Sequence, residues 1–238
     1  MAKTVLISGC GRGLGFCVVQ RHLAMGDQIF AQDYRITEEL QKLADAAPEQ
    51  LTVMACDIGS TAAVEATCKE ILKQTDRIDI LYNIAGIYRF EDKVPLTETN
   101  MDTFLDMYNI NAVGALRVCK GLWDALQPGS VIINISSEAG SVGASERKEE
   151  YAYCMSKAAM NMGAKIMSNE LAERSVKVVN LHPGWMRTVM GGPIAAQRTD
   201  LSVSPEESAA DIVGIALEAP SFPDQITYME HNRKPLPW

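Results

Sequence analysis

Short apolar runs alternate with longer amphipathic stretches along almost the whole chain. The apolar runs are rich in valine and isoleucine, as in VLI, VIINI and VKVVNL. Strands that are covered by helices on both faces have such continuous apolar runs, rather than strict alternation of apolar and polar residues. The pattern therefore predicts β–α–β units. Strands are expected at residues 4–8, 28–32, 51–55, 78–82, 131–136, 177–181 and 225–229.

Helical periodicity between these runs predicts helices that cover the sheet. They are expected near residues 13–25, 37–46, 60–75, 101–126, 151–173 and 205–217. The fold class is therefore α/β, with a doubly wound, mostly seven-stranded parallel sheet flanked by helices, the Rossmann fold. No repeat or long linker interrupts the pattern, so residues 1–238 are expected to form a single domain. Ligands of such sheets bind beyond the carboxyl ends of the strands.

Composition narrows the partners and the compartment. The net charge of −8 gives no general attraction to nucleic acid or to anionic membranes. No segment approaches the roughly 20 apolar residues that a membrane helix needs, and the apolar run near the N-terminus is too short for a signal peptide. The six cysteines are scattered and the three histidines lack ligand spacing. We therefore expect reduced thiols, a cytoplasmic protein and no metal site.

A glycine-rich turn follows the first predicted strand and opens the first predicted helix. Glycines allow a tight turn that brings backbone N–H groups and a helix N-terminus against a pyrophosphate. Such a turn could equally be an ordinary loop, but the strand before it and the helix after it favour a dinucleotide site. The residues expected to contact the cofactor here are Gly9, Gly11, Arg12, Gly13 and Leu14.

Asp33 ends the second predicted strand, where a carboxylate can accept hydrogen bonds from the adenosine ribose of NAD. The alternative is a turn residue without a ligand. Its charge would repel the 2′-phosphate of NADP, whereas Arg12 and Arg35 could pair with that phosphate. Repulsion at close range outweighs a flexible surface arginine, so NAD is the expected cofactor and NADP the alternative.

Tyr153 and Lys157 are four residues apart and lie on one face of a predicted helix. A phenol has an ordinary pKa near 10, and a neighbouring ammonium with the positive ring of an oxidised nicotinamide would lower it toward use as a base. On its own, the pair could be a solvated feature of a helix surface. Ser136 and Ser137 end the fifth predicted strand. Their resemblance to a family segment in which the second serine polarises the substrate oxygen favours catalysis, with Ser137 as the first choice and Ser136 as the second.

The glycine spacing at residues 9, 13 and 15, together with the tyrosine, lysine and serine, resembles the short-chain dehydrogenase/reductase family. The resemblance continues almost to the C-terminus and implies further site residues. By this resemblance, Ser137 polarises the substrate oxygen, Lys157 also holds the nicotinamide ribose, and Asn111 holds a water that links Lys157 to solvent. Further cofactor contacts implied by the resemblance are Asp57, Ile58, Asn83, Ala85, Gly86, Pro183, Gly184, Met186 and Thr188.

The chain departs from the family pattern at two places. Ile84 replaces a family asparagine, which removes one hydrogen bond of the sheet. The charged segment 145–150 lengthens the connection between Ser137 and Tyr153, and we interpret it as a loop at the rim of the active site that could contact the substrate or a neighbouring subunit. Residues 185–204 are expected to form a mobile lid over the substrate. The C-terminal residues 233–238 and the segment 190–193 resemble the C-factor-like branch of the family.

The resemblance implies an oxidoreductase that transfers a hydride between a nicotinamide cofactor and a small carbonyl compound or secondary alcohol, with Tyr153 as the general acid and base. A homodimer or homotetramer is expected, with helices 101–126 and 151–173 as interface candidates. Two alternatives are an enzyme similar to sugar-nucleotide epimerases or dehydratases, and a non-catalytic protein that senses NAD(P). The first usually needs a longer C-terminal domain, and the second would have lost Tyr153 or Lys157.

Overall fold

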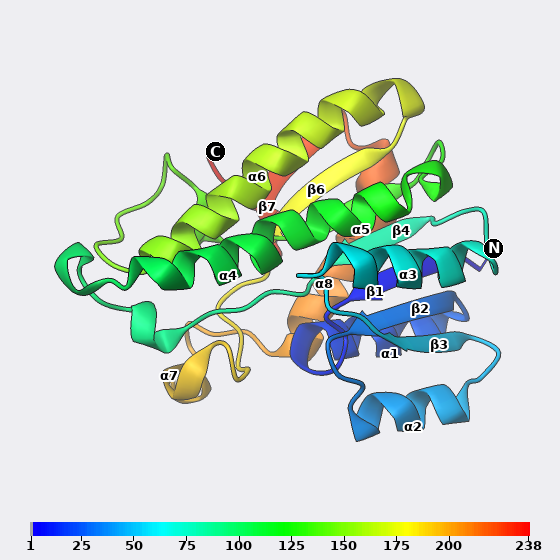
Figure 1. Cartoon of the computed structure of the whole chain (residues 1–238), viewed down its shortest axis with the longest axis horizontal. Coiled ribbons are helices and arrows are strands. Elements are labelled where there is room, and N and C mark those ends of the chain that lie inside the picture. The colour runs from blue at the N-terminus through cyan, green and yellow to red at the C-terminus, as the bar shows by residue number, and fades with distance from the viewer. Residues whose placement is uncertain (1) are drawn as a thin grey trace.

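Seven parallel strands form one sheet in the order β3-β2-β1-β4-β5-β6-β7. The computed structural model describes residues 2–238 (Figure 1). The strands are β1 Thr4–Ser8, β2 Gln28–Asp33, β3 Leu51–Ala55, β4 Ile80–Asn83, β5 Val131–Ile135, β6 Lys177–His182 and β7 Ile226–Glu230. All seven predicted strands are present, with ends that differ by one or two residues. The strand order reverses between β1 and β4, which is where a doubly wound sheet binds its ligands.

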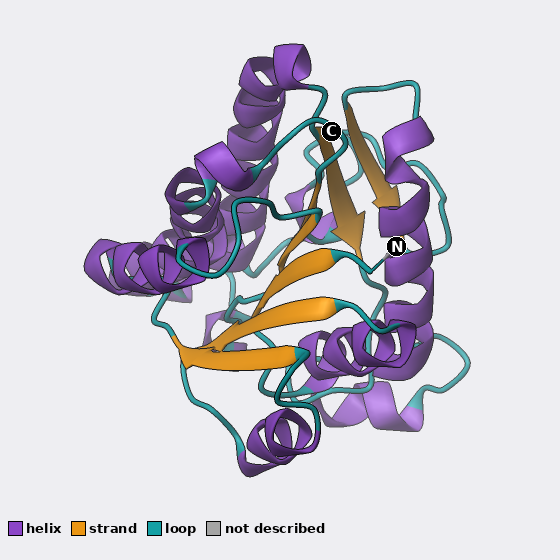
Figure 2. Ribbon diagram, turned by 90° about the vertical axis from the view of Figure 1, so that its right-hand side faces the viewer, coloured by secondary structure: helices purple, strands orange, loops and turns teal. Residues whose placement is uncertain are grey.

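Helices cover both faces of this sheet, as Figure 2 shows. They are α1 Gly13–Met25, α2 Glu38–Ala46, α3 Thr61–Leu72, α4 Phe104–Tyr108, α5 Ala115–Gly121, α6 Tyr151–Leu171, α7 Gly192–Gln197 and α8 Pro205–Glu218. Successive strand residues point to opposite faces, so Ile7 packs with the layer of α1, α2 and α8, whereas Leu6 packs with α3, α5 and α6. The doubly wound, seven-stranded parallel sheet expected from the sequence is therefore confirmed.

The prediction of one continuous helix over residues 101–126 is wrong. A π-helical stretch, Asn109–Gly114, separates α4 from α5. Such wide turns inside helices are rare and frequently mark functional sites. Here the stretch contains Asn111, whose side-chain amide bonds both backbone groups of Ile87 at 2.7 and 2.9 Å. The tertiary contact with Ile87 coincides with the wide turn, and periodicity alone cannot reveal it.

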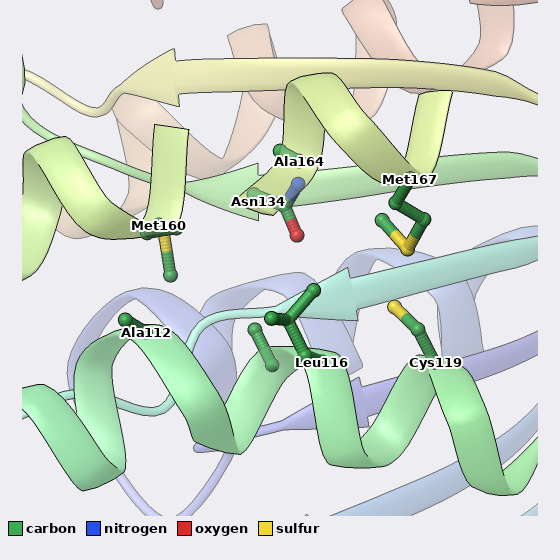
Figure 3. Close-up of a pocket in the computed structure, with 8 residues that line it drawn as sticks. Ala112, Leu116, Cys119, Asn134, Met160, Ala164 and Met167 are labelled. Carbon is green, nitrogen blue, oxygen red and sulfur yellow. The ribbon is translucent and has the colours of Figure 1, made fainter. Parts of the chain in front are cut away.

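Apolar side chains pack α5 against α6. Leu116 and Cys119 lie on one side of a narrow space, and Met160 and Met167 lie on the other (Figure 3). Asn134 on β5 lies behind this apolar contact in the same view. The polar group of Asn134 must therefore find its partners within the protein.

A row of buried asparagine side chains supplies those partners across three strands and one helix. Asn83 donates to Asn134 at 2.9 Å, Asn134 donates to Asn180 at 2.9 Å, and Asn180 donates to Asn161 of α6 at 3.0 Å. All four residues are at most 4% exposed. This amide row joins β4, β5 and β6 to α6 and so fixes α6 relative to the carboxyl ends of the strands.

We expect Asn180→Leu to lower the free energy of unfolding by about 1–3 kcal/mol, because buried amide groups of Asn134 and Asn161 would lose a partner. Urea unfolding followed by circular dichroism measures the change. The exposed Asn232 provides a matched control, since Asn232→Leu should change stability by less than about 0.5 kcal/mol. Equal effects of the two substitutions would contradict a stabilising role for the amide row.

Candidate active site

The glycine turn lies between β1 and α1 at the carboxyl edge of the sheet. Gly9 has φ of +79°, and a Cβ there would lie 2.4 Å from the backbone nitrogen of Ala85. This close approach packs the turn against the segment after β4 and requires glycine. Gly13 also has a positive φ, and a Cβ there would lie 3.4 Å from Thr188. The structure thus brings Gly9, Gly13, Ala85 and Thr188 together at the carboxyl edge of the sheet.

The N-terminus of α1 begins in this turn without a side-chain cap. Arg12 occupies the cap position and makes no side-chain capping bond, so the backbone N–H groups of the first turn remain for an anionic ligand. Leu14, expected to contact the cofactor, is buried and packs its side chain in the core. Any cofactor contact of Leu14 must therefore come from its backbone.

Asp33 ends β2 beside the glycine turn. Its carboxylate accepts a hydrogen bond from the backbone N–H of Gly11 at 2.7 Å and one from Arg35 N–H at 3.3 Å. A Cβ on Gly11 would lie only 3.1 Å from this carboxylate. The bonds fix a negative charge at the end of β2, where the ribose of a dinucleotide bound at α1 would lie.

Two expected cofactor contacts have side chains that are used elsewhere. Ile58 is buried against Gly114, where a Cβ would lie 2.7 Å from the Ile58 side chain. Asn83 donates to Asn134 within the sheet. Apolar packing and the amide row therefore occupy the side chains of Ile58 and Asn83, and the cofactor contacts of these two residues stay predictions that involve their main chain. Asp57 accepts from the N–H of Gly59 at 2.8 Å and lies partly exposed after β3.

The segment after β6 forms a loop with tied ends. Arg187 N–H donates to Val203, and Val203 N–H donates to Trp185, so the predicted lid 185–204 is anchored at its base and contains α7.

Gly184 has φ of +83° and lies against Val203. The carbonyl of Pro183 accepts a bond from Ser208. Met186 packs against the core, and Thr188 faces the glycine turn.

Lys157 and Tyr153 project from α6 toward the ends of β5. The Lys157 ammonium donates to the carbonyl of Ile135 at 2.7 Å and lies 5.8 Å from the centre of the Tyr153 ring. Within residues 2–238 this ammonium has that single hydrogen-bond acceptor, which leaves two N–H groups for a ligand. A Cβ on Gly86 would lie 3.7 Å from the same ammonium, so the segment after β4 also borders the site.

Burial dominates the ionisation of both groups. It raises the pKa of Tyr153 to about 12, against the opposing effect of the Ser137 hydroxyl, and it lowers the pKa of Lys157 to about 8. The expectation that Lys157 lowers the pKa of this phenol is therefore not met in the protein alone. The phenol stays protonated at neutral pH, because the loss of water outweighs the distant ammonium.

The two candidate serines have different surroundings. The Ser136 hydroxyl is buried and donates to Asn161 at 2.7 Å, as part of the structure that supports α6. The Ser137 hydroxyl donates to Glu138 at 2.6 Å and accepts from Ala139 N–H. Of the two, only Ser137 is close enough to affect the ionisation of Tyr153. The geometry favours Ser137 as the group that contacts a reacting oxygen.

Asn111 is buried behind Lys157, and its side chain is used by protein groups. Its amide bonds Ile87 and donates to Ser156 on α6 at 3.0 Å. A Cβ on Gly86 would lie 3.2 Å from the Asn111 side-chain oxygen. A water held by Asn111 stays a prediction, and it would have to bind the main chain of the π-helical stretch.

Sequence reasoning did not identify a chain of charged groups beside Tyr153. Glu138 pairs with Arg147 and lies 3.2 Å from His182. Arg147 also pairs with Glu150. Glu150 in turn accepts a hydrogen bond from the Tyr88 hydroxyl. The charged segment 145–150 was expected at the rim, and it does reach the site through Arg147 and Glu150. Its exact partners depend on tertiary contacts that no local pattern shows.

The groups at this edge of the sheet suit a dinucleotide. The uncapped N-terminus of α1 suits a pyrophosphate. The fixed Asp33 carboxylate suits an adenosine ribose, and the two unused N–H groups of Lys157 suit a second ribose. Among residues 2–238 there is no group of three or more histidine, cysteine, aspartate or glutamate side chains that could hold a metal ion. In the same range, no helix is both long enough and apolar enough to cross a bilayer.

Comparisons with known proteins agree with this geometry. The family model of the short chain dehydrogenases matches residues 3–199. The vibriobactin-specific 2,3-dihydro-2,3-dihydroxybenzoate dehydrogenase of Vibrio cholerae is 32% identical over 78% of this chain and 71% of its own. The C-signal protein of Myxococcus xanthus is 37% identical over 51% of this chain and 73% of its own.

A solved structure matches over the whole length. The carbonyl reductase of Pseudomonas aeruginosa PAO1 in complex with NADP has a TM-score of 0.83 and 31% identity, and the match covers 100% of both chains. This family uses NAD or NADP, so a nicotinamide dinucleotide is the cofactor expected at this edge of the sheet. The chain belongs to the short-chain dehydrogenase/reductase family of oxidoreductases.

Proposed function

We propose that this oxidoreductase interconverts a small ketone or aldehyde and the corresponding alcohol, with Tyr153 as the general acid and base. The observation that carries the proposal is the meeting of three groups at one edge of the sheet. Tyr153 lies beside Ser137, and Lys157 lies beneath its ring, next to the segment after β4. These groups surround the place where a carbonyl oxygen would lie beside a nicotinamide bound at the glycine turn.

Each side chain has a distinct task in this proposal. Bound NAD(P) supplies or accepts the hydride. The Tyr153 hydroxyl donates its proton to the carbonyl oxygen during reduction and receives it back during oxidation. Ser137 donates a hydrogen bond to the same oxygen as negative charge develops. Lys157, fixed by the Ile135 carbonyl, holds the nicotinamide ribose with its remaining N–H groups.

In the protein without cofactor, Tyr153 is a proton donor at neutral pH. Its pKa is raised to about 12 by burial, so the proton donor is fully loaded at neutral pH. In the oxidative direction, the positive ring of the oxidised cofactor would have to favour the phenolate.

The two other function classes are less well supported. An enzyme similar to sugar-nucleotide epimerases needs room for a large substrate, but the residues after Pro183 are used by α8 and β7 to complete the layers and the sheet. Within the described residues, the segments 145–150 and 185–204 remain near the site. A non-catalytic sensor has no need for Tyr153 and Lys157 to converge with Ser137.

We further propose that NAD is preferred over NADP. The support is the Asp33 carboxylate, which two backbone N–H groups hold in place, so that it cannot easily turn away from a 2′-phosphate. The NADP complex of the Pseudomonas carbonyl reductase shows that a relative accepts the other cofactor, which makes the choice a matter for measurement.

A homodimer or homotetramer in the cytoplasm completes the proposal. Large apolar side chains are exposed on α4 and α6, among them Leu105 at 74% and Met162 at 62%. Exposed apolar patches of this kind favour contact between subunits. The six cysteines are free thiols, which suits a reducing compartment.

We expect Tyr153→Phe to lower kcat/KM for carbonyl reduction at least about 100-fold, because the proton donor is removed. Cofactor affinity, measured by fluorescence titration with NADH, should change little. Lys157→Met should reduce both turnover and cofactor affinity. Near-normal turnover by Tyr153→Phe would overturn the proposed mechanism.

The serines provide a second prediction. We expect Ser137→Ala to slow reduction by about 100-fold or more without changing stability, as does loss of one donor to a developing oxyanion. Ser136→Ala should instead lower the melting temperature, since Asn161 would lose a buried partner. The reverse pattern would show that Ser136 is the group at the reacting oxygen.

For the cofactor, we expect kcat/KM with NADH to exceed that with NADPH, and Asp33→Ser to narrow or reverse the ratio because it removes the charge that repels the 2′-phosphate. Steady-state kinetics with both cofactors measure the ratio. An at least tenfold preference of the unmodified protein for NADPH would contradict the proposal.

A further inference from the structure

The charged chain beside Tyr153 closes into a ring around the phenol. On one side, Glu138 accepts the hydroxyl proton of Ser137. On the other side, Glu150 accepts the hydroxyl proton of Tyr88, whose ring packs edge-on against Tyr153 at 5.1 Å between centroids. Arg147 joins the two carboxylates.

Glu150 has an unusual backbone for its residue type. It is 6% exposed, and its φ of +66° lies in the left-handed region, which residues with a side chain rarely adopt. Such strain persists only where surrounding contacts hold it. The bonds from Arg147 and Tyr88 are the contacts that hold Glu150 at the start of α6, three residues before Tyr153.

The position of Glu138 creates a conflict with the proposed reaction. Ser137 has one hydroxyl proton, and Glu138 accepts it, although the reacting oxygen needs it. An ionised carboxylate beside that oxygen also opposes the negative charge that develops there. His182, Ser137 and Arg147 together overcome the effect of burial and hold the pKa of Glu138 below its usual value, so the carboxylate is ionised.

Arg147 resolves this conflict. Its guanidinium binds Glu138 and Glu150 at the same time, so it compensates the charge of one carboxylate and fixes the other. It lies in the segment that lengthens the connection between Ser137 and Tyr153, and its side chain is 34% exposed.

We propose that Arg147 is a positioning residue of the active site, which acts through Glu138 on Ser137 and through Glu150 on Tyr88 and Tyr153. The proposal rests on the proposed function for its effect on turnover. Arg147 weakens the hydrogen bond from the Ser137 hydroxyl to Glu138, and its two ion pairs fix Glu138 and Glu150 on either side of Tyr153. The added segment before α6 thereby becomes part of the reaction site.

Turnover tests the proposal through a charge-rescue cycle, with isatin and NADH or NADPH as the probe reaction. Arg147→Met should lower kcat/KM about tenfold or more, since it leaves an uncompensated carboxylate beside the reacting oxygen. Adding Glu138→Gln to Arg147→Met should raise kcat/KM at least about threefold above that of Arg147→Met, a non-additive result, and the remaining loss reflects Glu150, which still lacks Arg147. A double variant as slow as Arg147→Met would overturn the proposal.

Cys154 gives a readout that needs no turnover. It is the one cysteine that is not buried, and it lies next to Tyr153. Burial raises the pKa of the Cys154 thiol, the positive charge of Arg147 lowers this pKa, and the negative charge of Glu138 raises it. The ionisable groups around it are Arg147 and Glu138 from the segment before α6, Tyr88 from the segment after β4, and Tyr153 on its own helix.

The rate of alkylation of Cys154 by iodoacetamide at pH 8 reports the fraction of thiolate. Arg147→Met should slow the reaction about threefold or more and Glu138→Gln should accelerate it by a similar factor, because one pKa unit changes the thiolate fraction tenfold. Loosening of the segment would instead accelerate both. Any pattern without opposite signs would overturn the proposal.

Two controls complete the experiment. Lys148→Gln removes the same charge from an exposed neighbour of Arg147 and should leave both readouts within about twofold, as a surface substitution. Cys154→Ser identifies the labelled thiol. If the unmodified protein reduces no carbonyl compound, the proposed function fails, but the alkylation rates still test whether Arg147 and Glu138 act with opposite sign beside Tyr153.

Discussion

The row of buried amides from Asn83 to Asn161 is the constraint on which the rest of the site depends. Amide groups in an apolar interior must pair, since each unpaired group costs about 1–3 kcal/mol. Pairing is achieved only when β4, β5 and β6 lie in one register and α6 lies at one height above them. The bond from Lys157 to the Ile135 carbonyl then fixes the same helix at the end of β5. The reacting groups are thus placed by packing and hydrogen bonds that lie within the fold.

Burial then determines the chemistry that this placement allows. Loss of water keeps Tyr153 protonated and weakens the charge of Lys157, so the protein alone holds a proton donor rather than a base. The charged groups of Glu138, Arg147 and Glu150 lie in a chain beside this donor. Their charges act at short range in a partly dry site, where they are stronger than in water.

Much of the fold could be predicted from the sequence, because its determinants are local. Continuous apolar runs identified all seven strands, and the glycine turn identified the position of the first strand–helix junction. Tyr153 and Lys157 were predicted from their spacing on one helix face, from the serine pair and from the family resemblance. The roles of Ile58 and Asn83 could not be found in this way, because their side chains serve contacts with Gly114 and Asn134 that are distant in the sequence. The ion-pair partners of Arg147 also could not be predicted, because they depend on tertiary contacts. The same holds for the π-helical stretch at Asn111.

Direct hydride transfer is the central claim, and isotope transfer tests it most directly. The protein would be incubated with NADH or NADPH carrying deuterium at C4 of the nicotinamide, and with isatin, and the alcohol product would be analysed by mass spectrometry and NMR. The proposed function predicts one deuterium on the carbon that bore the reduced carbonyl, together with one equivalent of oxidised cofactor. Product without deuterium from either labelled face of the nicotinamide, or no net oxidation of cofactor with any carbonyl compound, would contradict it.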